Sequence, residues 1–384
     1  MEEKAIKLRY HKTNRGRMKI AYDAKRFFQN ASGLGNYSRD LVRILAEYFP
    51  ENHYLLLNKK ESERGASIMA KTNVEFLSFG KGKLARQLKA GKIAQERNAD
   101  IFHGLSGELP LKWDKSKDIK KIVTIHDLIF MRYPEYYSFF DRKIHLWKFK
   151  KAAQTADCII AISEQTKQDI LKYLKVDASK IRVVYQGCHE SFKKKKSYAE
   201  LQEIKERYQL PDKFLLNVGT VEPRKNISNV IKALEGRADI PLVIVGRRTA
   251  YAERIEKEAL KRKVNIRFLK VDTMEDLAGI YQLAMVFIYP SVFEGFGIPV
   301  IEALYSGTAT ITSNVSSLPE AGGEAALYVS PTNVEDIRSK IIFLWTHEGE
   351  RQRRIEAGLK YVQKFNDEVI AQDMMKVYDE VVTN

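Results

Sequence analysis

The stretch Ser291-Val-Phe-Glu-Gly-Phe-Gly-Ile-Pro-Val-Ile-Glu-Ala-Leu304 decides the fold of this chain. The apolar run before it, residues 285–290, is typical of a buried strand. Pro299 suits the first turn of a helix, because its missing N–H would be unpaired there anyway. A glycine loop between strand and helix lets a ligand approach the free N–H groups and the partial positive charge of the helix N-terminus. The sequence therefore predicts a ligand site here, framed by Glu294 and Glu302.

The composition is that of a globular protein of 384 residues, long enough for two or three domains, with a hydrophobic content of 44%. We expect no transmembrane helix, because no apolar stretch approaches about 18 residues. We expect no signal peptide, because the first residues are charged. Two cysteines, Cys158 and Cys188, argue against a disulfide framework, so the sequence predicts a cytoplasmic protein.

The formal net charge is +16 and the isoelectric point is near 9.5. Such a balance indicates an anionic partner, which could be nucleic acid, anionic lipid or a phosphorylated substrate. Charge alone does not choose among these three.

Strand and helix patterns alternate along the first half, which predicts a parallel sheet with helices on both faces. Residues 1–17 are polar and basic without periodicity and are predicted to be a flexible extension. Strands are expected at 18–23, 54–57, 74–79, 101–102, 121–125, 158–162 and 181–185. The first strand runs into a turn with Gly33 and Gly35 and then into a helical pattern, 37–49. This order opens nucleotide-binding α/β units, although the G-x-G-x-x-G fingerprint is absent.

A second α/β unit follows a lysine-rich segment, 190–212, which is predicted to be the linker. Its strands are expected at 214–220, 242–245, 266–269, 286–289 and 309–312, and the pattern from about 334 to 382 is helical. The predicted domains are therefore 18–190 and 205–364, both of the α/β class.

The form E-G-F-G-I-P-V-I-E from Glu294 to Glu302 resembles the signature of retaining glycosyltransferases with the GT-B fold, in which two Rossmann-like domains face each other across a cleft. Within that fold it resembles the GT4 family. The segment from His126-Asp-Leu to Pro134-Glu-Tyr-Tyr137 looks like the mannosyltransferase branch. The resemblance covers nearly all of the chain after Met18. It implies sugar transfer from a nucleotide diphosphate donor with retention of configuration, and a C-terminal helix, about 365–384, that crosses back to the first domain.

The resemblance also assigns catalytic roles. Arg224 and Lys225, which follow a strand that ends at a glycine, would stabilise the departing diphosphate as it gains charge. A solvated basic turn is the alternative for this pair. Glu294 would hold sugar hydroxyls, Glu302 the ribose, and His126 would contact the sugar beside its reacting carbon. The reaction would need no protein nucleophile, because front-face substitution lets the departing phosphate take the acceptor proton.

Further residues are predicted to line the cleft. On the donor side these are Gly33, Gly35, Gly219, Gly246, Arg247, Gly295, Phe296, Gly297 and Ile298. The helix behind Gly33 and Gly35 would meet the sugar diphosphate, and Gly246 and Arg247 would shape the base pocket. On the acceptor side His103 and Asp127 are candidates, together with Glu108, and an ordinary polar loop is the alternative for His103 and Glu108.

No metal site is predicted, because the chain has no Asp-x-Asp, His-x-x-x-His or Cys-x-x-Cys. This fits a transferase that neutralises a diphosphate with cations and helix ends. The sequence also lacks the Walker pattern of ATPases and the G-x-S-x-G of hydrolases.

Two basic segments, 81–93 and 139–151, are candidates for a peripheral contact with the inner face of a membrane. The second has Phe140, Ile144 and Trp147 at helical spacing. Ordinary helices that face the core, with solvated lysines, are the alternative.

GDP-mannose is the predicted donor, and UDP-glucose or another UDP-sugar is the alternative. The acceptor is expected to be a growing surface polysaccharide or a lipid-linked saccharide. The rival functions are an epimerase or phosphorylase on the same scaffold, an inactive relative, and a nucleic-acid-binding protein suggested by the +16 charge. The last would need basic residues clustered on one face with stacking aromatics.

Overall fold

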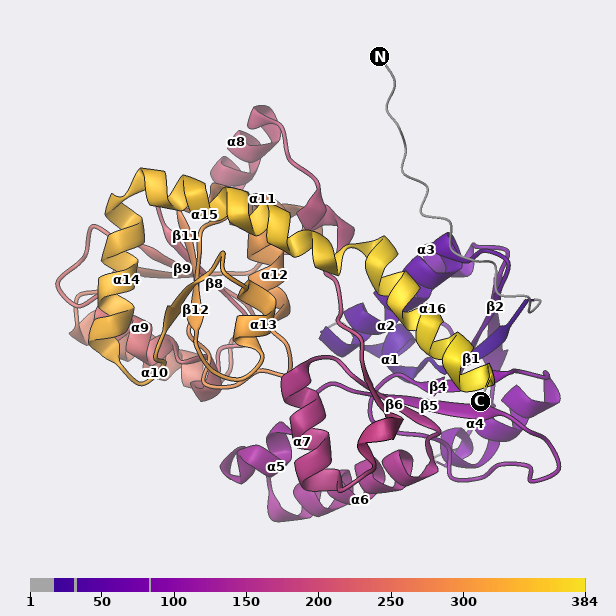
Figure 1. Ribbon diagram of the computed structural model, residues 1–384. Helices are drawn as coiled ribbons and strands as arrows, with labels where there is room; N and C mark the ends of the chain where they lie inside the picture. The colour runs from indigo at the N-terminus through magenta and orange to yellow at the C-terminus, as the bar shows by residue number, and fades with distance from the viewer. Residues whose placement is uncertain (1–16, 31–32, 83, 384) are drawn as a thin grey trace.

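The computed structural model describes residues 17–30, 33–82 and 84–383, and Figure 1 shows two lobes, each built around its own sheet. The predicted extension, 1–17, lies outside the described residues except for Arg17.

The first lobe contains a seven-stranded sheet in the order β3-β2-β1-β4-β5-β6-β7, and all its strands are parallel. The strands are β1 Lys19–Asp23, β2 His53–Asn58, β3 Val74–Ser78, β4 Ile101–Gly104, β5 Lys120–Ile125, β6 Cys158–Ala161 and β7 Ile181–Val183. The strand order reverses between β1 and β4. Ligands of open α/β sheets bind at the carboxyl ends of the strands at such a reversal.

The helices that follow these strands begin close to the strand ends. They are α1 Lys25–Gln29, α2 Gly33–Tyr48, α3 Ala66–Met69, α4 Ala85–Glu96, α5 Ile129–Arg132, α6 Phe139–Thr155 and α7 Glu164–Leu174. Helix α2 begins four residues before the predicted start at Tyr37, so Gly33 and Gly35 belong to its first turn and not to a separate loop.

The second lobe contains a six-stranded parallel sheet in the order β10-β9-β8-β11-β12-β13. Its strands are β8 Leu215–Val218, β9 Leu242–Val245, β10 Ile266–Leu269, β11 Val286–Tyr289, β12 Thr310–Ser313 and β13 Leu327–Val329. Its helices are α8 Tyr198–Arg207, α9 Ile227–Ala233, α10 Ala250–Lys261, α11 Met274–Leu283, α12 Ile298–Tyr305, α13 Leu318–Gly322, α14 Val334–Thr346 and α15 Glu348–Tyr361. The short strand β13 was not predicted.

The segment predicted as a linker, 190–212, contains helix α8. Its N-terminus is closed by a capping box, in which the Ser197 side chain accepts from the Glu200 backbone while the Glu200 side chain accepts from the Ser197 backbone. Such a box satisfies two free N–H groups at a helix start. Helix α8 packs on α11, so this part of the chain is a folded element of the second lobe.

The C-terminal helix, α16 Asp367–Thr383, lies on the first lobe, where Figure 1 shows it beside α2 and β1. Ile370, Met374 and Tyr378 are buried in the same apolar core as Ile20 and Leu41. The chain therefore returns to its first sheet after completing the second, as the resemblance implied.

Candidate functional site

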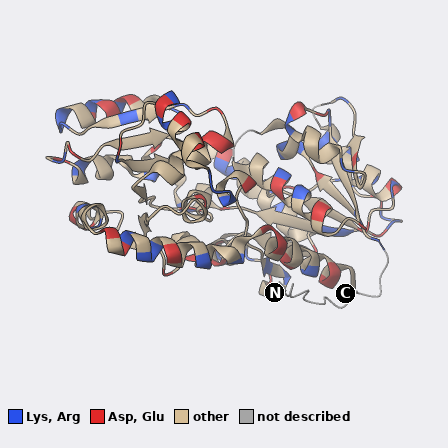
Figure 2. Ribbon diagram, turned by 90° about the horizontal axis from the view of Figure 1, so that it is seen from above, with Lys and Arg blue, Asp and Glu red and all other residues tan. Residues whose placement is uncertain are grey.

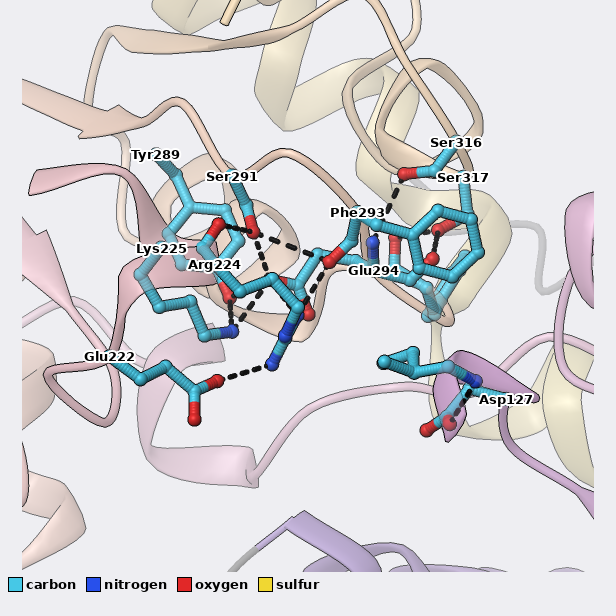
Figure 3. Close-up of polar contacts among 12 residues, drawn as sticks. Asp127, Glu222, Arg224, Lys225, Tyr289, Ser291, Phe293, Glu294, Ser316 and Ser317 are labelled. Carbon is cyan, nitrogen blue, oxygen red and sulfur yellow. Dashed lines mark hydrogen bonds and ion pairs between the residues drawn. The ribbon is translucent and has the colours of Figure 1, made fainter. Parts of the chain in front are cut away.

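The Glu294 carboxylate is the centre of a buried polar cluster at the carboxyl ends of β8 and β11 (Figure 3). Its Oε1 atom accepts from Lys225 Nζ at 2.6 Å, from Ser291 Oγ at 2.6 Å and from Tyr289 Oη at 2.9 Å. Arg224 Nη1 lies 2.8 Å from the same oxygen. Two cations and two hydroxyls from two segments of the chain, 224–225 and 289–291, therefore converge on one carboxylate oxygen.

The cluster shifts the pKa values of its three charged groups in different directions. Burial alone would raise the pKa of Glu294, but the charges of Lys225 and Arg224 outweigh it and hold this pKa at about 2. Burial and the neighbouring Arg224 lower the pKa of Lys225, which Glu294 partly offsets. Burial also opposes the charge of Arg224, but Glu294 raises its pKa overall. Glu294 is thus ionised, and it holds both cations in place.

Arg224 and Lys225 lie in a turn after β8, and two glycines at the ends of β8 and β9 let the backbone there approach closely. Gly219 and Gly246 have φ angles of +147° and +155°, and a Cβ at Gly246 would lie 1.9 Å from the Gly219 carbonyl oxygen. Only glycine is suited to both positions. The turn is tied to the signature loop, residues 290–297, because Asn226 Nδ2 donates to the Pro290 carbonyl at 3.0 Å and Ser291 Oγ lies 3.0 Å from the Arg224 carbonyl oxygen.

Two serines that the sequence did not single out support the signature loop from behind. The Glu294 backbone N–H donates to Ser316 Oγ at 3.1 Å, while Ser317 Oγ donates to the carbonyls of Glu294 and Phe296 at 2.9 Å and 2.8 Å. Ser316 has a φ angle of +54°, a conformation that L side chains rarely adopt. The two serines lie on the segment after β12, and they belong to no motif that predicts this role.

Glu302 lies in α12 and has quite different surroundings. Its Oε2 atom accepts from Tyr281 Oη at 3.0 Å. Burial raises the pKa of Glu302 to about 7, although the Tyr281 hydroxyl lowers it somewhat and Asp40 raises it further. Glu302 therefore changes its charge near neutral pH, whereas Glu294 does not.

His126 follows β5 in the first lobe. Its Nε2–H donates to the Leu105 carbonyl at 2.9 Å, and its ring packs edge-on against Tyr37 at 4.5 Å. Burial lowers the pKa of His126 to about 4, against the opposite effect of the Leu105 carbonyl. The ring is therefore neutral at pH 7, and Nδ1 is left with a lone pair that can accept a hydrogen bond from a hydroxyl.

The two lobes meet where the signature loop contacts the first sheet. Ser163 Oγ donates to the Gly295 carbonyl at 2.6 Å, and a Cβ at Gly295 would lie 2.2 Å from the His126 carbonyl oxygen. Asp127, drawn beside the cluster in Figure 3, accepts from the Ile129 N–H at 3.1 Å. The structure thus brings together His126, Asp127 and the loop that carries Glu294, although they are far apart in the sequence.

Comparisons with known proteins agree with this geometry. The family described as Glycosyltransferase Family 4 matches residues 31–192, and the family described as Glycosyl transferases group 1 matches residues 199–361. The chain belongs to the glycosyltransferases. The predicted GT4-type assignment is confirmed, and with it a nucleotide-sugar donor and a saccharide acceptor.

Individual relatives cover most of this glycosyltransferase. It is 26% identical to the O-antigen chain mannosyltransferase B of Escherichia coli over 94% of this chain and 99% of that protein. It is 33% identical to the O-antigen chain mannosyltransferase RfbU of Salmonella typhimurium over 57% of this chain and 59% of that protein. A crystal structure of a glycosyltransferase from Rickettsia africae matches with a TM-score of 0.77 at 18% identity, over 96% of this chain and 99% of that chain. The predicted GT-B fold is confirmed.

The remaining donor-side candidates of the glycosyltransferase differ in their accessibility. Gly297, with a φ angle of +117°, caps the start of α12, which Ile298 begins. Arg247 is exposed beyond β9. Phe296 is buried against Tyr185 and Phe365, so it supports the loop from the core and does not offer its ring to a ligand.

The first-turn glycines of α2 also differ from each other. Gly33 is exposed, and a Cβ there would meet no atom within 4 Å. Gly35 is buried, and a Cβ there would lie 2.0 Å from the Asn30 carbonyl oxygen, so this position needs glycine for packing. Tyr37 of the same helix contacts His126, which places the start of α2 next to the histidine.

His103 does not occupy the position expected of a cleft residue. Its side chain is fully buried within β4, where Nδ1 is 2.7 Å from Tyr378 Oη and Nε2 is 2.7 Å from Thr124 Oγ1. Burial lowers the pKa of His103 to about 3, so the ring is neutral. His103 is buried because α16 covers this part of the sheet. Glu108, in the loop after β4, pairs with Arg86 and Lys148.

Among residues 17–30, 33–82 and 84–383, no three His, Cys, Asp or Glu side chains are grouped in a way that could hold a metal ion. Within the same ranges, no helix is both long and apolar enough to cross a membrane. The two predicted basic segments fall largely on α4 and α6, and α6 exposes Phe140, Ile144 and Trp147.

Proposed function

We propose that this glycosyltransferase transfers mannose from GDP-mannose to a saccharide or lipid-linked acceptor in the synthesis of surface polysaccharide or glycolipid. The observation that carries the proposal is the pair of cations, Arg224 and Lys225, held by Glu294 at the carboxyl ends of the strands beside the N-terminus of α12. The names of the relatives, which are mannosyltransferases of O-antigen chains, favour mannose. A UDP-sugar donor is the alternative.

The donor would bind mainly to the domain predicted at 205–364. Its diphosphate would lie against Arg224, Lys225 and the first turn of α12, because cations and helix N-termini both attract phosphate oxygens. The ribose would reach Glu302, and the backbone at Gly219 and Gly246 would let the nucleotide approach closely. The acceptor would bind mainly to the domain predicted at 18–190.

The reaction breaks the bond between the sugar C1 atom and the diphosphate oxygen and forms a bond between C1 and the acceptor oxygen. Charge develops on the departing diphosphate, and fixed cations stabilise this charge more in the transition state than in the ground state. The acceptor proton passes to the departing phosphate oxygen, so no protein nucleophile is required and configuration is retained. His126, neutral at pH 7, would accept a hydrogen bond from the transferred sugar through Nδ1.

The proposal also assigns the role of a divalent metal ion to Arg224 and Lys225. We therefore expect EDTA at about 5 mM, an excess over trace metal, to leave the transfer rate unchanged. The check is an initial-rate assay with and without chelator, repeated after adding Mg²⁺ or Mn²⁺. A rate that depends on added metal would contradict the role given to the two cations.

A basic and apolar face on α6 supports peripheral membrane contact as part of the proposal. Phe140 and Trp147 are 76% and 56% exposed, and Ile144 lies between them on the same helix face. Exposed aromatics next to lysines can lie in a lipid interface. A cytoplasmic location at the inner face of a membrane stays a prediction.

Nucleic-acid binding is the second candidate raised by the net charge. Figure 2 shows Lys and Arg interspersed with Asp and Glu along the helices of both lobes. A nucleic-acid-binding surface needs basic residues gathered on one face, so the charge distribution favours the sugar-transfer proposal.

The direct test is transfer of labelled mannose from GDP-mannose to acceptors in membranes of the organism that makes this protein. Lipid-extractable and polysaccharide products are counted, and UDP-glucose and UDP-N-acetylglucosamine are tested in parallel. We expect label to enter the acceptor from GDP-mannose, and the new linkage to have the anomeric configuration of the donor. Transfer from a UDP-sugar alone would replace the donor, and transfer with inverted configuration would contradict the mechanism.

A further inference from the structure

A cavity lies in the first lobe, and the residues of the Glu294 cluster do not line it. It has a volume of about 450 Å³ and opens between α1, α4 and α6. The chain segments that line it follow the carboxyl ends of β1, β2, β3 and β4, and α6 closes its far side. This is the edge of an open α/β sheet where ligands bind.

Two of the segments that line the cavity also contact or influence His126. The loop after β4 lines the cavity at Glu108 and Leu109, and three residues earlier the Leu105 carbonyl accepts from His126. The α1 segment lines it at Lys25, and the neighbouring Arg26 is near enough to lower the pKa of His126, after the larger effect of burial. A ligand held here would therefore extend from the first lobe toward His126.

The walls of the cavity carry an excess of positive charge. Among the described residues that line it, the basic side chains are Lys25, Lys59, Arg86, Lys148 and Lys151, and the acidic one is Glu108. Arg86 is already neutralised, because it pairs with Asp23 at 2.6 Å and with Glu108 at 2.9 Å. Lys148 pairs with the other Glu108 oxygen at 3.2 Å.

Three of these cations keep their charge available for a ligand. Within the part of the chain that the structure describes, Lys25, Lys59 and Lys151 have no carboxylate within ion-pair distance. The pKa of Lys25 is lowered mainly by burial and also by Arg86 and Arg26, against the opposite effects of Glu108 and Asp23. An anion in the cavity would pair with these three lysines.

The other walls are apolar and unusually open to solvent. Trp147 is 56% exposed, Leu84 is 63% exposed and Leu111 is 42% exposed. Trp147 also continues the exposed face of α6 formed by Phe140 and Ile144, since the three side chains recur at helical spacing. An apolar chain that entered along this face would reach the cations without leaving apolar contact.

We propose that this cavity binds a phosphate or diphosphate ester of a long apolar alcohol, with the phosphate at Lys25, Lys59 and Lys151 and the first part of the chain against Leu84, Leu111 and Trp147. This inference rests on the proposed sugar transfer, since it makes the ligand the lipid carrier of the acceptor. The saccharide beyond the phosphate would then point toward His126.

The test is calorimetric titration of the full chain with farnesyl phosphate below its micellar concentration. Farnesol supplies the chain without charge, whereas inorganic phosphate and mannose 1-phosphate supply charge without the chain. We expect farnesyl phosphate to bind about tenfold more tightly than each of the three, because only it satisfies both walls. The emission of Trp147 should shift to shorter wavelength as the chain covers it.

Two neighbouring lysines of α6 provide matched variants. Lys151→Gln should weaken farnesyl phosphate about tenfold, whereas Lys150→Gln, an equal loss of charge on the same helix but outside the cavity, should not. Equal weakening by both variants would reduce the effect to general surface charge and overturn the site. Equal affinity for farnesol would overturn the phosphate role, and equal affinity for mannose 1-phosphate would overturn the lipid.

Titration of GDP-mannose on the same variants separates this inference from the proposed function. We expect Lys151→Gln to bind GDP-mannose as the wild type does. If farnesyl phosphate binds while no nucleotide sugar does, the mannosyl transfer fails and the cavity assignment stands. If GDP-mannose binds and farnesyl phosphate does not, the cavity assignment fails alone.

Discussion

Glu294 and Glu302 lie eight residues apart in the sequence but have very different surroundings. Around Glu294 two cations and two hydroxyls converge on one oxygen, and the pKa of the carboxyl is held at about 2. Around Glu302 the nearest partner is the Tyr281 hydroxyl, and burial raises the pKa to about 7. Glu294 is therefore ionised at neutral pH and pairs with Arg224 and Lys225. Glu302 can gain or lose a proton near neutral pH.

The comparison teaches that a motif predicts which residues are present but not their charge. Glu294 acts through Arg224 and Lys225, which come from a turn about 70 residues earlier in the chain. The state of Glu302 depends on α11, which supplies Tyr281. Both environments are set by tertiary contacts, so substitutions at each should have separable consequences.

The largest effect is expected from Arg224→Ala. Removing a cation that stabilises the departing diphosphate should lower kcat on the order of 10²–10³-fold. The fold should persist, because Lys225, Ser291 and Tyr289 still hold Glu294. Steady-state kinetics with GDP-mannose measure the loss. Arg353→Ala, which removes an exposed arginine paired with Glu350, is the control and should keep normal turnover. Normal turnover in Arg224→Ala would remove its catalytic role.

Glu294→Gln should destabilise the folded protein. Without the carboxylate, buried Lys225 loses its ion pair and lies beside half-buried Arg224, which keeps its pair with Glu222, so the free energy of unfolding should fall by about 3 kcal/mol. Urea denaturation at pH 7 measures this change. Glu75→Gln breaks an exposed pair with Arg97 and should change stability by no more than about 0.5 kcal/mol. Equal effects of both variants would mean that the Glu294 cluster is solvated.

The two glutamates should also respond to pH in opposite directions. The pKa of Glu302 is raised in the folded state, so the folded protein binds more protons than the unfolded chain between about 4.5 and 7. The contribution of Glu302 to stability should therefore decrease by about 2 kcal/mol as pH rises from 5 to 8, whereas the lowered pKa values of His103 and His126 make their contributions increase over this range. The difference in the free energy of unfolding between the wild type and Glu302→Gln isolates the Glu302 contribution, because both proteins keep the two histidines. The pKa of Glu294 is lowered, so its contribution is lost only as pH falls from about 4.5 toward 2.

Urea denaturation across pH 5 to 8, on the wild type and on Glu302→Gln, separates these contributions. A difference between the two proteins that stays constant across this pH range would contradict the raised pKa of Glu302.

Donor affinity should show the smallest effect, through the same proton. A ribose hydroxyl donates best to an ionised carboxylate, and a group with a pKa of about 7 is about tenfold more ionised at pH 8 than at pH 6. The affinity of the wild type for GDP-mannose should therefore rise about tenfold over this range. Calorimetric titration at the two pH values is the measurement, and Glu302→Gln should show no such change. A flat profile in the wild type would separate Glu302 from the ribose.

The sequence pointed to Glu294, Arg224 and Lys225 as separate site candidates because they follow strands directly, but it did not predict that they pair with one another. A strand that ends in glycine fixes where the next few residues lie, so Arg224 and Lys225 after β8 and the signature loop after β11 had to meet at one sheet edge. The supporting Ser316 and Ser317 could not be predicted, because their role depends on how the segment after β12 packs behind the loop.

Elsewhere the missing information was long-range. His103 was predicted to line the cleft, but Tyr378 of α16, 275 residues later, covers it. Helix α8 lies in the lysine-rich segment predicted to be the linker, although its capping box, Ser197 with Glu200, is a signal in the sequence. The cavity with Trp147 and Lys151 has no motif at all, because four loops and one helix assemble it.

The central claim is that the signature segment binds a nucleotide sugar, and a thermal-stability titration at pH 8 tests it most directly. GDP-mannose, UDP-glucose, UDP-N-acetylglucosamine and UDP-galactose are each added to the wild type and to Glu302→Ala, since a ligand that binds the folded state raises its apparent stability. The account predicts that GDP-mannose selectively raises the Tm of the wild type and loses this effect in the variant. An equal rise in both proteins, or no rise with any of the four donors, would contradict it.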